Sequence, residues 1–234
     1  MAVILNIETS TTVCSVALSR DGQCVFSRRN DDGGQHGTLL GVYVDEALQH
    51  AKVHLLTLDA VCVSKGPGSY TGLRIGVSLA KGVCYGQQVP LLAVPTTEVL
   101  CVPLLLYRHD IDTSALFCPM IDARRMEVYS ALYDAALRPV REVEADVVTA
   151  DTYRPWLDEH VVYFFGNGAA KCKEVIAHPN ARFIEDIVPD AKHMFPLAEK
   201  RYWAQQWEDV AYFTPFYLKD FVAKPARDLL HMGK

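Results

Sequence analysis

Short apolar runs separated by polar turns fill the first part of the chain. Three of them predict strands that pair antiparallel, at residues 3–8, 13–18 and 23–28. The Asp21-Gly22 dipeptide between the last two is a strong signal for a tight hairpin turn. Helices and strands then alternate, with a helix at 36–51, a strand at 59–63, a helix at 70–86 and a strand at 89–94. This order implies that the later strands pair in parallel through crossover helices.

The second half of the chain repeats this plan in a poorer form. Strands are predicted at 115–121, 126–133, 138–143 and 161–165. Helical segments are predicted at 149–159, directly after Gly166-Asn167-Gly168, and at 196–207. We therefore expect an α/β protein of two lobes with mixed sheets flanked by helices, divided into residues 1–113 and 114–234, the second lobe being the reduced copy.

A glycine loop, Gly66–Gly68, joins strand 59–63 to helix 70–86. Glycine and proline supply a tight turn and a close approach of backbone. Ser69 or Thr71 can cap the helix that follows. Such a strand–loop–helix element serves either as a cradle for an anion at the helix start or as a structural corner.

Small residues distinguish the two predicted helices of the first lobe. They recur at four-residue spacing: Gly72, Gly76 and Ala80 on helix 70–86, and Gly37 and Gly41 on helix 36–51. Interior glycines destabilise a helix by about 1 kcal/mol each relative to alanine, so some close contact should offset them. Two interpretations remain open: the helices pack closely over their own sheet, or one small-residue face forms an interface with a partner protein.

Other motifs carry weaker chemical signals. Lys65 precedes the glycine loop, so the spacing of a phosphate-binding P-loop is absent. His50 and His54 have the spacing of helical metal ligands, but two exposed histidines at a helix end fit the pattern better. Glu8 at a strand end could hold a Mg²⁺–phosphate, although one carboxylate is little support for such a site. Asp122–Arg125 is interpreted as a β-corner closed by an Asp–Arg pair.

Composition and charge narrow the class of protein. The chain has 234 residues, half of them hydrophobic, and a formal net charge of −5, which disfavours direct nucleic-acid binding by this chain alone. Its seven cysteines are scattered without a C-x-x-C pair, as in reduced cytosolic proteins. No apolar stretch reaches the length of about 18 residues typical of a membrane span, and the start does not resemble a signal peptide. We expect a cytoplasmic protein without a metal, a cofactor or a membrane contact.

Four motifs in order give the chain a recognisable pattern. They lie at residues 3–11, 66–76, 121–129 and 216–221. Together they resemble the TsaB (YeaZ) family, a branch of the actin/Hsp70/sugar-kinase (ASKHA) superfamily and a paralogue of TsaD. Lys219 stands in the last motif where that family usually has arginine. The resemblance implies two RNase H-like lobes.

The resemblance also implies a function. TsaB proteins are needed to make N6-threonylcarbamoyladenosine (t6A) at position 37 of tRNAs that read codons beginning with A. In that pathway TsaD is the catalytic transferase, the ATPase TsaE joins the complex, and TsaB is the dimerising partner that meets tRNA only through the complex. We therefore expect a non-catalytic subunit that forms a heterodimer with TsaD, and a homodimer when alone.

The site residues follow from the same comparison. The predicted partner-binding residues are the small and apolar positions of the two helices, Gly37, Leu40, Gly41, Val44, Gly72, Leu73, Gly76, Val77 and Ala80. The predicted remnant of a nucleotide site is Glu8, Thr9 and Ser10. TsaD holds its metal partly through H-x-E-x-H, and in the comparable run of this chain Thr96 and Leu100 replace the histidines. The alternative hypothesis is an active ASKHA-type ATPase or a glycoprotease-like peptidase, which would need Glu8 or Ser69.

Overall fold

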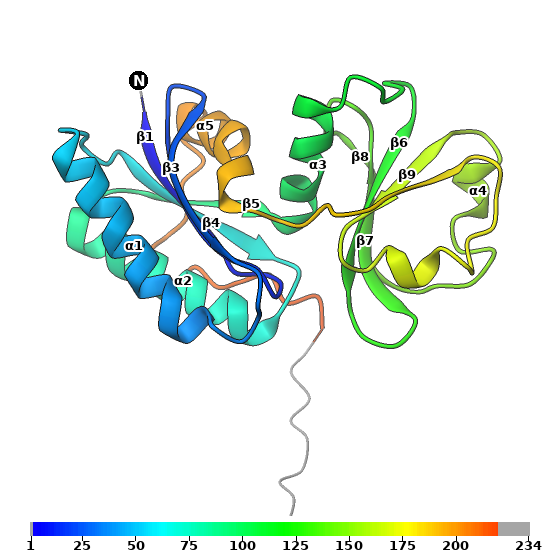
Figure 1. Cartoon of the computed structure of the whole chain (residues 1–234), viewed down its shortest axis with the longest axis horizontal. Coiled ribbons are helices and arrows are strands. Elements are labelled where there is room, and N and C mark those ends of the chain that lie inside the picture. The colour runs from blue at the N-terminus through cyan, green and yellow to red at the C-terminus, as the bar shows by residue number, and fades with distance from the viewer. Residues whose placement is uncertain (1, 220–234) are drawn as a thin grey trace, which may run out of the picture.

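The protein, described here by a computed structural model of residues 2–219, consists of two lobes, each built on a five-stranded mixed sheet (Figure 1). The first sheet contains β1 (Val3–Glu8), β2 (Cys14–Arg20), β3 (Gln23–Asn30), β4 (Ala60–Gly66) and β5 (Leu91–Pro95). The second contains β6 (Leu116–Asp122), β7 (Glu127–Tyr133), β8 (Pro139–Val147), β9 (Val162–Phe165) and β10 (Ala181–Ile184). The helices are α1 (His36–Val53), α2 (Tyr70–Gln87), α3 (Thr96–Tyr107), α4 (Arg154–Leu157) and α5 (Phe195–Trp203).

The two sheets have the same topology. Their strand orders are β3-β2-β1-β4-β5 and β8-β7-β6-β9-β10. In each sheet the first three strands pair antiparallel, and the last two add in parallel beside the first. The predicted mixed sheets and the repeated plan are confirmed, and the fold is that of an RNase H-like pair of lobes.

Helices cover both faces of the first sheet, which explains why β1 is buried along its whole length. Leu5 and Ile7 point to the face covered by α1 and α2, whereas Ile4 points to the face covered by α3 and α5 (Figure 1). Successive residues of a strand face opposite sides, so a strand covered on both faces reads as a continuous apolar run.

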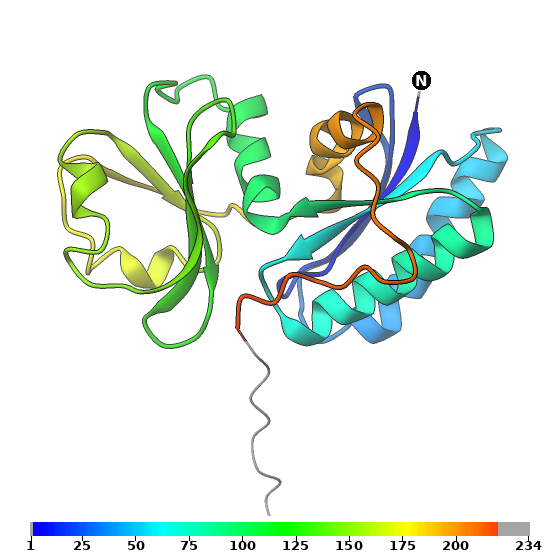
Figure 2. The ribbon, with the colours of Figure 1, turned by 180° about the vertical axis from the view of Figure 1, so that it is seen from behind.

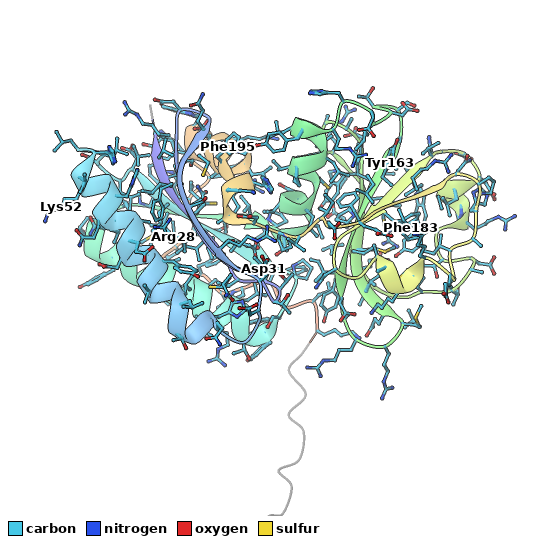
Figure 3. The ribbon with its side chains drawn as sticks, in the orientation of Figure 1. Arg28, Asp31, Lys52, Tyr163, Phe183 and Phe195 are labelled. Carbon is cyan, nitrogen blue, oxygen red and sulfur yellow. The ribbon has the colours of Figure 1, made fainter. Side chains whose placement is uncertain are left out.

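Aromatic packing fills the second lobe. On one face of its sheet Phe183 stacks on Phe164, with ring centroids 5.2 Å apart, and on the other face Tyr163 stacks on Phe117 at 5.9 Å. Figure 3 shows the labelled residues Tyr163 and Phe183 inside this lobe. No described helix in either lobe is both long and apolar enough to cross a membrane.

After β10 the chain returns to the first lobe. The backbone N–H of Ala191 donates to Ser15 Oγ at 2.9 Å, and α5 packs against β1 and β5. Residues 204–219, which we call the strap, then run along α2 towards the second lobe (Figure 2). The division expected at 113–114 assigns residues 191–213 to the second lobe, whereas described residues of this range, such as Leu197 and Phe213, pack with the first lobe.

Other differences from the sequence-based expectation are local. The helices expected at 149–159 and after Gly168 shrink to the four residues of α4 and one 3₁₀ turn, Ala170–Cys172. Helix α3 and strand β10 had no predicted counterpart. Helix α3 contains Pro103 and is buried on several sides, so it lacks the amphipathic pattern that marks a surface helix.

The first turn of α2 packs directly on the end of β1. Ser69 caps the helix, its Oγ accepting from the N–H of Gly72 at 3.2 Å. Thr9 Oγ1 donates to the carbonyl of Gly72 at 2.8 Å. A Cβ at Gly72 would lie 2.1 Å from the carbonyl oxygen of Thr9, and one at Gly76 would lie 2.2 Å from its Oγ1. Only glycine permits this approach.

A buried polar cluster stabilises the second lobe. Asp146 accepts from Arg141 at 2.7 Å and from the hydroxyl of Tyr153 at 2.8 Å, and Ser130 also donates to it. Burial alone would raise the pKa of Asp146, but the hydrogen bonds from Arg141, Ser130 and Tyr153 outweigh it and lower that pKa. The Arg141 guanidinium also lies 5.4 Å from the ring centroids of Tyr153 and Trp156.

Matched substitutions on α2 test the packing at Gly72. Gly72→Ala forces the Thr9 backbone to move, so we expect the free energy of unfolding to fall by about 2–3 kcal/mol in urea denaturation. Gly82→Ala on the same helix meets no atom within 4 Å and should stabilise by about 0.5–1 kcal/mol, because alanine is the better helix former. Equal effects of the two substitutions would contradict the close contact with Thr9.

Acid unfolding tests the cluster at Asp146. Because folding lowers the pKa of this carboxyl group, its contribution to stability is complete above the ordinary pKa of about 4 and is lost as the pH falls through the lower folded value. Asp146→Asn leaves Arg141 buried without its partner and should cost about 3 kcal/mol at pH 7. The variant should also lack part of the acid dependence, measured as the unfolding free energy between about pH 2 and pH 6. The same acid dependence in variant and wild type would contradict this role.

Candidate functional site

The glycine loop is filled by the protein's own backbone. Gly66 has φ +110°, and a Cβ there would lie 2.6 Å from the carbonyl oxygen of Phe216 in the strap. A Cβ at Gly68 would lie 2.2 Å from the carbonyl oxygen of Ser10, which also accepts from the N–H of Ser69 at 2.6 Å. An anion at this position would have to displace both carbonyl groups. The loop is therefore a structural corner rather than an open phosphate cradle.

The three residues predicted as the remnant of a nucleotide site are fully buried. Glu8 ends β1, and its Oε1 accepts from the N–H of Ser10 at 2.6 Å. Within residues 2–219, neither Glu8 Oε2 nor Ser10 Oγ has a hydrogen-bond partner. Burial raises the pKa of Glu8 because it disfavours the charged form, although the nearby polar groups of Ser10 and Ser64 oppose the shift. Thr9 is held by Gly72, so the structure brings these residues together but turns them inward.

The residues that the resemblance compares with the metal-binding run of TsaD have structural partners in this chain. Thr96 Oγ1 lies 2.7 Å from Ser64 Oγ, Leu100 is completely buried, and Glu98 Oε2 accepts from Arg201 at 3.4 Å. Within residues 2–219 no three His, Cys, Asp or Glu side chains lie close enough together to hold a metal ion. The ring centroids of His50 and His54 lie 4.2 Å apart at the end of α1, and these two histidines do not belong to a group of three such side chains within the described residues.

Most residues predicted for partner binding face the protein's own interior. Those buried in the first lobe are Leu40, Val44, Gly72, Leu73, Gly76, Val77 and Ala80. The prediction that they form an exposed surface is wrong, because these positions lie on the faces that α1 and α2 turn to the first sheet. Gly37 and Gly41 are exposed, as predicted for a contact surface. The small-residue stripe of α2 thus serves close packing on the sheet, the other interpretation that the sequence allowed.

A different set of residues forms the outward surface of the two helices, which lie next to each other (Figures 1 and 2). Its small and apolar positions are Gly37, Gly41, Val42, Gly82, Tyr85 and Gly86, which we call the outer α1–α2 face; polar residues such as Asp45, Arg74 and Ser78 are exposed on the same helices. A Cβ at any of its four glycines would meet no atom within 4 Å. Val42 is 51% exposed and Tyr85 is 78% exposed. Gly82 and Gly86 repeat the four-residue spacing in the sequence, and that signal could have revealed the surface.

The corner between β6 and β7 differs from the expected Asp–Arg pair. Asp122 pairs with Lys171, whose Nζ also donates to the carbonyl of Glu127 at 2.7 Å. Arg124 and Arg125 are exposed, both at positive φ. Lys219, the last described residue, pairs with Glu127, so the motif at 216–221 reaches this corner; its Asp220 and Phe221 lie outside the described residues.

Comparison with known proteins places these features in a family. The family model TsaD, tRNA N6-adenosine threonylcarbamoyltransferase, matches residues 33–227. TsaB of Bacillus subtilis, a tRNA threonylcarbamoyladenosine biosynthesis protein, is 32% identical over 180 residues, which are 74% of each chain. TsaB of Escherichia coli is 28% identical over 240 residues, covering 94% of this chain and 96% of that one.

Solved structures of similar proteins lead to the same family as the sequence comparisons. YeaZ from Pseudomonas aeruginosa superposes with a TM-score of 0.77 at 27% identity, covering 93% of this chain and 100% of that one. A second structure, an uncharacterized protein with similarity to peptidase YEAZ from the same organism, gives a TM-score of 0.79 at 26% identity, covering 94% and 100%. The four motifs, the repeated sheet topology and these matches agree: the chain belongs to the TsaB (YeaZ) family of the actin-like ATPase superfamily.

Proposed function

We propose that this chain is a non-catalytic subunit of the machinery that makes t6A at position 37 of tRNAs reading ANN codons. It binds a TsaD-type transferase as a heterodimer, TsaE joins that pair, and tRNA is met only through the complex. Membership of the TsaB family supports the pathway. The role places the chain in the cytoplasm, where tRNAs are modified, and the same docking surface would allow a homodimer when the partner is missing.

The observation that carries the proposal is the outer α1–α2 face. Gly41 and Gly82 lie in helix interiors, where each glycine costs about 1 kcal/mol relative to alanine, yet neither has a neighbouring atom that would exclude a side chain. Glycines that the fold itself does not need are explained by the approach of another backbone. Exposed Val42 and Tyr85 supply apolar area beside them. The TsaD family model covers both helices, so a related lobe is a suitable partner.

The interior of the first lobe supports a non-catalytic role. Glu8 is inaccessible, the glycine loop is filled, and Ser69 Oγ is used as the cap of α2. The alternative hypothesis is that the chain is an ATPase or a peptidase, and one structural neighbour is described as similar to a peptidase. It needs Glu8 or Ser69 to reach a substrate, and in this conformation Glu8 cannot.

Charge insertion on the outer α1–α2 face tests the docking. Gly41→Arg and Gly82→Arg each place a long cation at an exposed position where a Cβ meets no atom of residues 2–219 within 4 Å, so the fold should remain intact. We expect binding to a purified TsaD-type transferase, measured by size-exclusion chromatography and calorimetry, to weaken at least about a hundredfold, as for a bulky group at an interface centre. Threonylcarbamoyl transfer by the reconstituted complex should fall in parallel.

Val147→Arg is the matched control. Val147 is 67% exposed on β8 of the other lobe, so the same residue is inserted away from the docking surface. Its affinity and activity should equal those of the wild type. Unchanged binding by the Gly41 and Gly82 variants, with thermal unfolding also unchanged, would refute the proposed interface.

Glu8→Gln separates a structural role from a catalytic one. Because burial raises the pKa of Glu8, ionisation favours the unfolded chain once the pH exceeds the ordinary value of about 4. The stability of Glu8→Gln relative to wild type should therefore increase from about pH 4 to pH 7, measured by urea denaturation. The variant should also retain the transfer activity of the reconstituted complex. Loss of that activity in a folded variant would favour the enzymatic alternative.

A further inference from the structure

A cavity of about 350 Å³ opens between α3, α5 and the β7–β8 hairpin. Its apolar lining includes Val102 and Leu105 from α3, Leu197 from α5 and Leu137 from the hairpin, and its polar lining is Glu98, Lys200, Arg201 and Gln206. Helices α3 and α5 lie on the opposite side of the first sheet from α1 and α2 (Figure 1), so the proposed docking surface does not cover the cavity that they line. The volume is in the range of small-molecule sites, which are mostly apolar with a few convergent polar groups.

The hairpin wall is fixed in place before any ligand arrives. Leu137 has φ +57°, an unfavourable conformation for leucine, and its N–H donates to the carbonyl of Asp134 at 3.0 Å. The carboxylate of Asp134 accepts from the N–H groups of Ala136 and Arg138, each at 2.9 Å. Leu137 packs against the clusters of both lobes, so the cavity is bounded by ordered elements on three sides.

The polar groups of the cavity carry an excess of positive charge. The side chain of Arg201 is 17% exposed. Within the described residues its guanidinium donates one hydrogen bond, to the carboxylate of Glu98 at 3.4 Å. A guanidinium has five N–H donors, and those of Arg201 that make no hydrogen bond within residues 2–219 are not buried, so they are open to solvent or to a ligand. Lys200 also lines the cavity and has no ion-pair partner among residues 2–219. Two cations thus face one carboxylate.

We propose that this cavity binds a small amphiphilic carboxylate. The apolar body of the ligand lies on Val102, Leu105 and Leu197, and its carboxylate accepts from the free N–H groups of Arg201, with Lys200 adding a second positive charge. A planar monoanion matches both the fork geometry of arginine and the single excess charge, whereas a phosphate dianion would exceed that charge beside Glu98. The site is additional to the proposed docking function and does not depend on it.

Titration of the full-length protein with octanoate, followed by calorimetry and by ligand-observed NMR, tests the site. Octanol and octylamine serve as probes with the same chain but without the anion. We expect saturable binding of octanoate and at least about tenfold weaker binding of the other two, because charge-assisted hydrogen bonds are the stronger ones. Octanol binding as tightly as octanoate would overturn the assignment of Arg201 as the anion receptor.

Variants locate the binding. Arg201→Gln should weaken octanoate at least about tenfold, and Ala136→Phe, which adds a ring to an exposed residue on the cavity wall, should abolish binding. Glu98→Gln removes the carboxylate that competes for Arg201 and should strengthen octanoate binding, an effect that a purely structural Arg201 would not produce.

The control variant is Arg138→Gln, which changes the same hairpin outside the cavity and should bind octanoate as tightly as the wild type. Undiminished binding by Ala136→Phe, or no gain with Glu98→Gln, would refute the site.

Discussion

The docking of α2 onto the end of β1 is the contact on which the rest of the structure depends. Two glycines let the helix backbone approach Thr9, and the turn that follows β1 is thereby pulled against the glycine loop. The same approach turns Glu8 inward and leaves the carbonyl of Ser10 over Gly68. One close-packed corner therefore explains both the stability of the first lobe and the burial of residues that an enzyme of this fold would expose.

The two faces of the first sheet have different uses. Helices α1 and α2 bury their small and apolar stripe on one face and leave bare glycines pointing outward, which suits a flat contact with another chain. Helices α3 and α5 cover the other face and leave a cavity that is lined by Arg201. A protein partner and a small ligand could thus bind without competing, since the sheet separates them.

The sequence predicted the sheets well because alternation and Asp21-Gly22 report directly on backbone geometry. The sequence did not predict α3, because burial on several sides removes the helical periodicity and Pro103 is unfavourable inside a helix. The glycines of α2 show the limit of spacing arguments. Gly72 and Gly82 look alike in the sequence, and only the surrounding atoms reveal that one meets a backbone and the other open space. The motif resemblance, by contrast, identified the family correctly.

The strap has a consequence for how the lobes move. It is hydrogen-bonded to the first lobe where Glu208 N–H meets the carbonyl of Leu91, where Lys81 Nζ meets that of Ala211, and where Phe216 N–H meets that of Lys65, and it ends on Glu127 of the second lobe. Rotation of one lobe against the other would have to break the Lys219–Glu127 ion pair or detach the strap from the first lobe. The strap therefore gives the two lobes a second connection, which runs from the residues beside α2 to the corner between β6 and β7.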